Sequence, residues 1–332
     1  MLRYALPALL LASILPTYAQ SAAAAADIPL IERSKIFGNP TKTGANISPD
    51  GKWLSWIAPR DGVLNVWVAP ASDLSKAKPL TDEKTRPIRS NFWSPDSSTV
   101  LFIQDKGGDE NFLLYGVDVV SGKQTNYTPF EKTRVQIVNI SSKVKDRILI
   151  GLNNRDPRWH DVHSLDLKTG KLTLVQKNEG YGSFVADEQL KLRLAQKPAA
   201  GGGVNYFRIT DGKIDDSKPM TEVGLDDVLT TAPLGFTVDG KTLYWADSRN
   251  RNTSALLAQD VASGKTSVVA EDPRADIGGA LLDKRTGRVL AYSVEYLKQE
   301  YFALSKDLKG DLDFLKKNVK GEFSLGSRTD AD

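Results

Sequence analysis

A pattern that recurs every ~40–50 residues constrains the fold of this chain more than any other feature. It consists of an acidic turn, an apolar run of strand length, a polar loop with glycine, and a second apolar run. Residues 92–123 show it most completely, and Ser94-Pro95-Asp96-Ser97 forms their turn. Residues 48–70 and 237–265 repeat the same order. Repetition at this scale predicts an architecture built from similar units.

Two markers recur in step along the chain. Acidic corners are predicted at Asp50, Asp96, Asp146, Asp187, Asp239 and, in the sixth unit, Asp283 or the adjacent Thr286. Hairpin turns are predicted one strand before units end, at Ser121-Gly122-Lys123, Thr169-Gly170-Lys171, Asp211-Gly212-Lys213 and Ser263-Gly264-Lys265. A unit of this length with four short strands is typical of a β-propeller blade. A chain of β-sandwich domains, the competing all-β architecture, would not show this fixed period.

The second unit shows the expected strands. They are Ile88–Trp93, Thr99–Gln104, Phe112–Val119 and Lys123–Tyr127. The glycine-rich stretch 197–203 lies between two strand runs of one unit, so it is predicted to be a hairpin loop and not a linker.

Helical periodicity is confined to residues 305–318. Leu308, Leu312 and Leu315 fall at i, i+4 and i+7, and Ser305 stands at the N-cap position. This pattern predicts a short amphipathic helix after the third strand of the sixth unit.

The last residues begin a seventh unit. Gly321–Arg328 has strand character, and Asp330, which follows Asp239 by about two repeats, is predicted to be the acidic corner after it. The predicted fold class is therefore all-β: a β-propeller with six blades plus the first strand of a seventh, and one short helix near the C-terminus. Residues 44–332 are expected to form this one propeller domain, incomplete at its C-terminus, with a gap between the last strand and the first blade.

Residues 1–19 match the pattern of a secretory signal peptide. Arg3 supplies the positive charge, Ala5–Leu15 is apolar but shorter than the ~20 residues that cross a bilayer, and Thr17-Tyr18-Ala19 is a small-residue cleavage site. A buried N-terminal helix is the alternative, and two prolines in the stretch disfavour it. We predict a signal peptide, a lead-in segment over 20–43, and a secreted or periplasmic protein.

Composition excludes several classes of function. The 44 basic and 41 acidic residues give a net charge of only +3, which provides no basis for nucleic-acid binding. The absence of cysteine excludes disulfides, thiolate-bound metal and a thiol nucleophile. No segment after the signal peptide is apolar enough to cross a membrane, so no membrane partner is expected.

Several motifs resemble the propeller domain of the prolyl oligopeptidase family of serine peptidases. They are Trp93-Ser94-Pro95-Asp96, Gln104-Asp105-Lys106-Gly107-Gly108-Asp109-Glu110-Asn111, Asn153-Asn154-Arg155-Asp156-Pro157-Arg158-Trp159-His160-Asp161-Val162 and Leu190-Lys191-Leu192-Arg193. The resemblance covers residues 35–332, and the most similar branch is that of secreted bacterial dipeptidyl- and acylaminoacyl-peptidase-like members. It implies a seven-bladed propeller that filters short peptide substrates by size. It also implies a following α/β-hydrolase domain that carries the catalytic Ser, Asp and His.

The catalytic part of that family pattern is missing from the chain. No G-x-S-x-G elbow occurs, and the two histidines, His160 and His163, follow no such elbow. The chain alone is therefore predicted to be inactive, with no catalytic residues, and an α/β-hydrolase domain is expected to be encoded downstream. The two histidines are three residues apart on a predicted strand, where they face opposite sides, so no metal site and no cofactor are predicted.

The acidic pair Asp109 and Glu110 is the candidate substrate-binding feature. In the dipeptidyl branch that the chain resembles, an acidic pair on the propeller binds the free amino terminus of the substrate, although in another sequence setting. The alternative is a solvated hairpin in which Gly107 and Gly108 make the turn. For Arg155, Asp156 and Arg158, intramolecular ion pairs are expected in preference to substrate contacts.

Two functions remain open at this point. The first is the substrate-gating, non-catalytic propeller part of a prolyl-oligopeptidase-like serine peptidase that acts on short peptides. The alternative is a stand-alone periplasmic β-propeller that binds a protein partner. The coding sequence after Asp332 would distinguish them.

Overall fold

The computed structural model describes residues 30–331. The predicted signal peptide and residues 20–29 of the predicted lead-in lie outside the described residues. Helix α1 (Arg33–Phe37) belongs to an N-terminal unit that ends at Gly38, and none of its five residues is buried. Residues 39–331 belong to the second unit.

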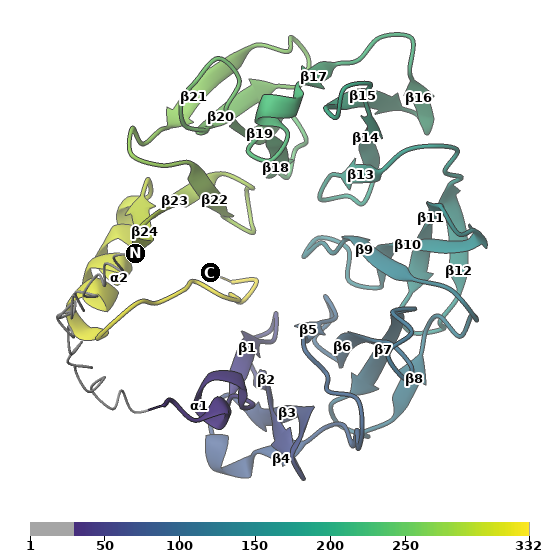
Figure 1. Cartoon of the computed structure of the whole chain (residues 1–332), viewed down its shortest axis with the longest axis vertical. Helices are drawn as coiled ribbons and strands as arrows, with labels where there is room; N and C mark the ends of the chain where they lie inside the picture. The colour runs from purple at the N-terminus through teal and green to yellow at the C-terminus, as the bar shows by residue number, and fades with distance from the viewer. Residues whose placement is uncertain (1–29, 332) are drawn as a thin grey trace, which may run out of the picture. The chain divides into compact units, whose positions relative to one another are not determined.

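Six antiparallel sheets follow one another around a central axis, as the blades of a β-propeller do (Figure 1). Blades one to three contain β1 (Thr43–Ile47), β2 (Trp53–Arg60), β3 (Val63–Pro70) and β4 (Lys78–Pro79); β5 (Phe92–Trp93), β6 (Thr99–Gln104), β7 (Leu113–Asp118) and β8 (Gln124–Asn126); and β9 (Val135–Asn139), β10 (Arg147–Asp156), β11 (Trp159–Asp166) and β12 (Leu172–Gln176). Blades four to six contain β13 (Ser183–Ala186), β14 (Leu192–Pro198), β15 (Val204–Thr210), β16 (Lys213–Asp215) and β17 (Thr221–Val223); β18 (Ala232–Phe236), β19 (Thr242–Asp247), β20 (Ala255–Asp260) and β21 (Thr266–Ala270); and β22 (Ile277–Leu282), β23 (Val289–Tyr296) and β24 (Lys298–Ala303). Single-turn 3-10 helices lie at Leu74–Lys76 and Leu225–Asp227.

The predicted six-bladed propeller is confirmed. The acidic corners predicted for the six blades lie between the first and second strands, and the four glycine-lysine turns lie between the third and fourth strands, whereas Asp330 has no strand on either side within the described residues. The stretch 197–203 overlaps the end of β14 and forms the hairpin to β15, as expected. We call the end of the propeller that carries the acidic turns the corner end, and the opposite end, where second and third strands are joined, the loop end.

Three corners share one hydrogen-bond pattern. In each, an aspartate Oδ1 accepts a bond of 2.6 Å from a hydroxyl two residues earlier and one of 3.1 Å from the amide two residues later. These aspartates are Asp50, Asp96 and Asp239. Asp146 lies in the corner of the third blade, but its carboxylate does not accept the hydrogen bonds of the turn. Its side chain is 62% exposed, and Ser141 Oγ accepts the turn amide of Lys143 instead.

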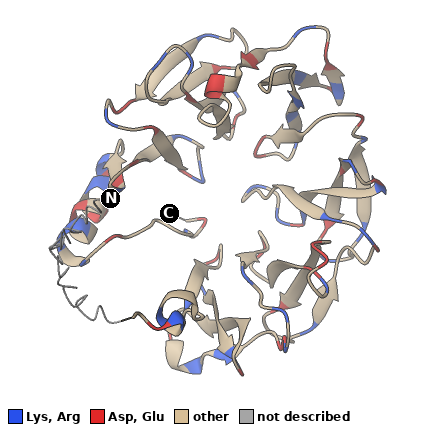
Figure 2. Ribbon diagram, viewed as in Figure 1, with Lys and Arg blue, Asp and Glu red and all other residues tan. Residues whose placement is uncertain are grey.

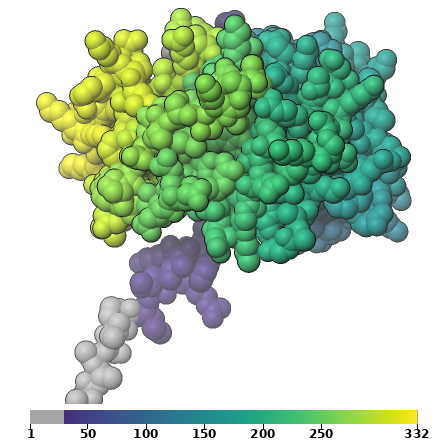
Figure 3. Space-filling model, turned by 90° about the horizontal axis from the view of Figure 1, so that it is seen from above, coloured from purple at the N-terminus to yellow at the C-terminus, as the bar shows by residue number. Residues whose placement is uncertain are grey.

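Apolar clusters fill the space between consecutive blades. Blades one and two share Ile57, Val66 and Phe102, for example, and corresponding clusters join each following pair up to blades five and six. In Figure 3 the fourth, fifth and sixth blades (green to yellow) abut without a visible break. Because sheets bury an apolar face only against another layer, these clusters hold the blades together.

No cluster of the described residues joins the sixth blade to the first. The free face of the sixth blade is instead covered by α2 (Lys306–Asn318), which buries Leu312, and by Phe323 and Leu325. The predicted helix is therefore confirmed in place and length. Ser305 is its N-cap residue, but its side chain makes no capping hydrogen bond, contrary to the expectation from the sequence.

Residues 319–331, which we call the closing segment, run between the sixth blade and the first (Figure 1). Leu325 N–H donates to the hydroxyl of Tyr301 in blade six, whereas Ser327 Oγ accepts from Ile47 N–H in blade one. The strand predicted over Gly321–Arg328 does not form as a regular strand. In each blade the inner strand pairs with the strand that follows its corner, and among the described residues the closing segment has no such partner.

Charge is distributed evenly over the blades. Lysine and arginine side chains alternate with aspartate and glutamate around the propeller, without a large region of one sign (Figure 2). Within residues 30–331, no helix has the length and apolar character needed to cross a membrane.

Candidate functional site

The loop of the second blade, residues 105–112, is held by a buried carboxylate at its base. The side chain of Asp105 is 3% exposed and accepts bonds from Arg86 Nε at 3.0 Å and from Arg86 Nη2 at 2.6 and 2.8 Å. It also accepts the backbone N–H of Glu110 at 3.2 Å. Burial raises the pKa of Asp105, but the bonds from Arg86 and Glu110 outweigh it and leave that pKa below its usual value. Asp105 therefore stays ionised and ties the loop to the connection between the first and second blades.

The predicted acidic pair lies at the exposed tip of this loop. Asp109 Oδ1 accepts the N–H groups of Asn111 at 3.1 Å and Lys106 at 3.3 Å, and its Oδ2 accepts Asn111 Nδ2 at 3.0 Å. The hydrogen bonds from Asn111 hold the pKa of Asp109 below its usual value. Asp109 therefore uses its carboxylate to shape the loop.

Glu110 differs from its neighbour. Its backbone has φ of +58°, a left-handed conformation uncommon for a residue with a side chain, and its side chain is exposed. Within the described part of the chain, its carboxylate makes no hydrogen bond or ion pair. The loop therefore presents the Glu110 carboxylate to the surroundings while Asp109 is engaged.

The loops of the second and third blades adjoin. Val135 N–H donates to Phe112 O at 2.8 Å, and the guanidinium carbon of Arg134 lies 5.5 Å from the centre of the Phe112 ring. Asn153 Oδ1 accepts the N–H of Arg134 at 2.6 Å, and its Nδ2 donates to Pro157 O at 3.1 Å. The first asparagine of the recognised motif thus joins the start of β9 to the tip of the next hairpin, a link that the sequence alone did not reveal.

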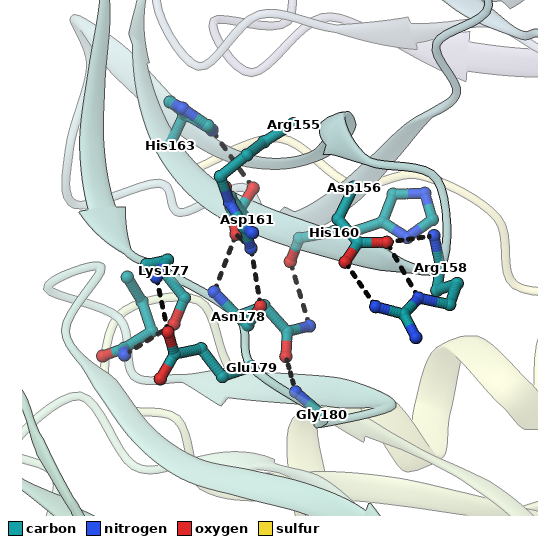
Figure 4. Close-up of polar contacts among 11 residues, drawn as sticks. Arg155, Asp156, Arg158, His160, Asp161, His163, Lys177, Asn178, Glu179 and Gly180 are labelled. Carbon is teal, nitrogen blue, oxygen red and sulfur yellow. Dashed lines mark hydrogen bonds and ion pairs between the residues drawn. The ribbon is translucent and has the colours of Figure 1, made fainter.

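The third-blade hairpin contains a second buried carboxylate (Figure 4). The side chain of Asp161 is 4% exposed and receives Arg155 Nε at 2.6 Å and Arg155 Nη2 at 2.7 Å. Asn178 N–H donates to Asp161 at 2.7 Å, and Arg155 Nη2 donates to Asn178 O at 2.7 Å. Burial raises the pKa of Asp161, but the bonds from Arg155 and Asn178 outweigh it, so the net pKa is lowered. Asp161 and Arg155 therefore join the hairpin to the connection that leads to the fourth blade.

Asp156 and Arg158 form the second ion pair of this hairpin. Arg158 Nη2 lies 2.9 Å from Asp156 Oδ2, and Arg158 N–H donates to Asp156 Oδ1 at 3.0 Å. The side chain of Arg158 lowers the pKa of Asp156 to about 2. The intramolecular pairs expected for Arg155, Asp156 and Arg158 are therefore confirmed.

The two histidines do not converge (Figure 4). His163 Nδ1 lies 3.1 Å from Asp161 O, whereas His160 Nε2 is buried and has no hydrogen-bond partner among the described residues. Burial lowers the pKa of His160, and the nearby positive charge of Arg134 lowers it further, so the ring is neutral at physiological pH. No group of three or more His, Asp or Glu side chains within residues 30–331 could hold a metal ion.

A cavity of about 390 Å³ lies inside the propeller and is lined by residues of all six blades. Its wall includes Trp93, Ser142, Glu188 and Val238, and the closing segment contributes Gly326–Arg328 and Asp330. We call it the axial cavity. Asp109 and Glu110 do not line it. The cavity could not be predicted from the sequence, because its wall is formed by inner strands and corners that lie far apart in the chain.

Comparison with known proteins places this arrangement in a class. No family model matches the chain. It is 45% identical over 322 residues to dipeptidyl aminopeptidase BIII of Pseudoxanthomonas mexicana, and the match covers 96% of this chain and 46% of that protein. It is 26% identical over 336 residues to dipeptidyl peptidase family member 6 of Caenorhabditis elegans, covering 96% of this chain and 44% of that protein. The Pyrococcus horikoshii acylaminoacyl peptidase has a similar fold, with a TM-score of 0.50, 18% identity, and coverage of 81% of this chain and 44% of that one.

The fold is a β-propeller, and the curated relatives that match almost the whole of this chain are dipeptidyl peptidases. The chain spans slightly less than half the length of the curated relatives that it matches. The match extends over 96% of this chain, and the resemblance to the propeller portion of a prolyl-oligopeptidase-like peptidase that was stated from the sequence is confirmed.

Proposed function

We propose that this chain is the substrate-gating, non-catalytic part of a prolyl-oligopeptidase-like serine peptidase that acts on short peptides. The observation that carries the proposal is the 45% identity to a dipeptidyl aminopeptidase over 96% of this chain, in a sequence without a G-x-S-x-G elbow. Hydrolysis would be carried out by an α/β-hydrolase domain, and this chain would supply part of the substrate cavity. We also propose export to the periplasm or the medium, because residues 1–19 have the pattern of a signal peptide.

Within this proposal, the second-blade loop binds the free amino terminus of the peptide. Glu110 is the contact residue because its carboxylate is exposed and unpaired in the described structure, while Asp109 is satisfied by Lys106 and Asn111. A carboxylate and an ammonium group attract weakly in water, by ~0–1 kcal/mol, and more strongly where solvent is excluded. Covering the loop by a second domain would provide that exclusion.

A chimeric enzyme tests both parts of the proposal. The matched region of the Pseudoxanthomonas relative is replaced by residues 39–331 of this chain, and hydrolysis of dipeptidyl substrates is measured. We expect an active chimera in which Glu110→Gln raises KM for substrates with a free amino terminus by about tenfold, the equivalent of ~1.4 kcal/mol. Asp109→Asn should act through loop order and change KM and thermal stability together.

Two controls separate the outcomes. For an N-acetylated substrate, KM should be unchanged by Glu110→Gln. The chain by itself should not react with a fluorophosphonate serine probe. Stoichiometric labelling of the isolated chain would contradict the non-catalytic assignment. Unchanged kinetics for Glu110→Gln would assign the loop the role of a solvated hairpin.

A further inference from the structure

The closing segment lies at the corner end of the axial cavity. Gly326–Arg328 and Asp330 belong to the cavity wall, and Thr329–Ala331 also line a hollow outside it together with the corners of blades one and two. The segment is fixed there through its backbone, because Asp330 N–H donates to Pro49 O at 2.8 Å. The closing segment therefore lies beside the mouth of the cavity at this end.

The carboxylate of Asp330 is held by two lysines from different blades. Lys145, in the corner of blade three, donates to Asp330 Oδ2 and also to Pro95 O at 2.9 Å. Lys284, in the corner of blade six, lies 3.3 Å from Asp330 Oδ1 and donates to Arg328 O at 2.6 Å. The carboxylate thus connects blades on different sides of the axis across the mouth of the cavity.

The other acids that line the axial cavity or the outer hollow have hydrogen-bond partners of their own. Asp50 and Asp96 border the outer hollow, but each accepts hydrogen bonds from its own turn. Glu188 lines the cavity and accepts Ser141 Oγ at 2.7 Å. Asp330 is therefore the carboxylate that satisfies both lysines, and it comes from a segment without a strand partner.

We propose that Lys145 and Lys284 form a binding site for a peptide carboxylate, that Asp330 occupies this site in the closed state, and that the C-terminal carboxylate of a short peptide replaces Asp330 and opens the axial cavity. The proposal rests on the proposed function in assuming that short peptides reach this propeller. The cavity volume lies within the ~300–1,000 Å³ typical of small-ligand sites. A C-terminal carboxylate is the anionic group that every unmodified peptide carries.

The ion pairs of Asp330 are weak enough for a peptide carboxylate to replace it. Both lysines and Asp330 are partly exposed, so each ion pair contributes only modestly to stability. A carboxylate tethered by the same chain competes at an effective concentration in the millimolar range. Free peptides at millimolar concentration should therefore displace it measurably, whereas amidated peptides should not.

The absence of cysteine allows access to the cavity to be measured directly. Ser142 lines the cavity and makes no hydrogen bond through its hydroxyl within the described structure, so Ser142→Cys introduces one thiol with little change. The rate at which a small neutral maleimide labels it is compared with and without Asp330→Asn. We expect Asp330→Asn to raise the rate about tenfold, and Lys145→Met with Lys284→Met to do the same.

Two further single-cysteine proteins provide the controls. Val120→Cys, 80% exposed in the turn between β7 and β8, should label at the same rate in every background. Val117→Cys, 1% exposed between blades one and two, should stay unlabelled and reports any general unfolding. Equal labelling of Ser142→Cys in both backgrounds, with Val117→Cys protected, would overturn the proposal.

The peptide itself is tested by hydrogen exchange on the unmodified chain. Millimolar Ala-Ala should speed exchange of the Asp330 and Ile47 amides, which bond Pro49 O and Ser327 Oγ, by several-fold. Ala-Ala amide should have no effect, and Asp330→Asn should remove the response. An equal response to the dipeptide and its amide would disprove carboxylate exchange. Because neither readout requires hydrolysis, failure of the peptidase proposal is distinguishable from failure of this one.

Discussion

Both faces of the first blade are apolar, but their surroundings differ. One face contributes Ile57, Val66 and Val68 to a cluster with the second blade, and all three are fully buried. The opposite face carries Trp56 and Trp67 in a small cluster to which no described residue of another blade belongs. The same sheet therefore has one face in the core of the protein and one face without a partner blade.

This difference shows that the composition of a strand does not determine whether its blade packs against a neighbouring blade. Strand β2 is apolar at successive positions, a pattern typical of a strand buried on both faces. Burial is decided by the neighbouring element. Between blades one and two that element is a complete sheet, whereas between blades six and one it is the closing segment, which is held by ion pairs and single hydrogen bonds.

The largest difference is expected from two substitutions in the same strand. Ile57→Ala removes buried methyl groups between blades one and two and should lower the free energy of unfolding by about 2–5 kcal/mol. Leu54→Ala, at a half-buried position on the opposite face, should cost only about 1 kcal/mol. Denaturant unfolding followed by circular dichroism measures both. Equal losses would show that the second face is as tightly packed as the first.

A smaller effect on the free energy of unfolding is expected from the Asp105–Arg86 ion pair, which lies at the loop end between blades one and two. Asp105→Asn leaves Arg86 without its carboxylate and should cost about 1–2 kcal/mol at neutral pH, since Arg86 is partly exposed. The folded state lowers the pKa of Asp105, so the stabilisation is complete above the unfolded value of about 4 and is lost as pH falls through the lower folded value. Unfolding measured from pH 7 down to pH 2 should therefore show the two proteins converge in acid. A constant difference would mean that the loss comes from packing.

Local signals made much of the fold predictable from the sequence. The Ser-Pro-Asp turns, the glycine-lysine turns, the helix and the hairpin at residues 197–203 are all determined by residues within a few positions of one another. Asp146 shows the limit of such markers. It lies in the predicted corner, but the turn is made by Ser141, because the chain reaches that corner with a different spacing.

The contacts that organise the candidate site could not be predicted in this way. Asp105 pairs with Arg86 from the connection before its blade, and Asp330 pairs with Lys145 across the propeller. These pairings depend on the three-dimensional arrangement of blades and leave no periodic trace in the sequence. The family motif did mark the Arg155 hairpin, but its bond to Asn178 appears only in the structure.

The smallest global effect is expected where the closing segment meets the first blade. Ser327→Ala removes the 2.6 Å bond that Ile47 N–H donates to Ser327 Oγ. A single exposed hydrogen bond contributes about 1 kcal/mol or less, and Ile47 N–H can bond to water instead, so global unfolding should hardly change. Hydrogen exchange at Ile47 should nevertheless accelerate about tenfold, because local opening is sufficient to expose it.

Ser324→Ala is the matched control. Among the described residues, Ser324 Oγ donates to Gln299 of blade six and not to blade one, so its loss should leave the Ile47 amide protected. If Ser327→Ala instead lowered global stability as much as Ile57→Ala, the seam between blades six and one would be as cooperative as the seam on the other face of the same sheet.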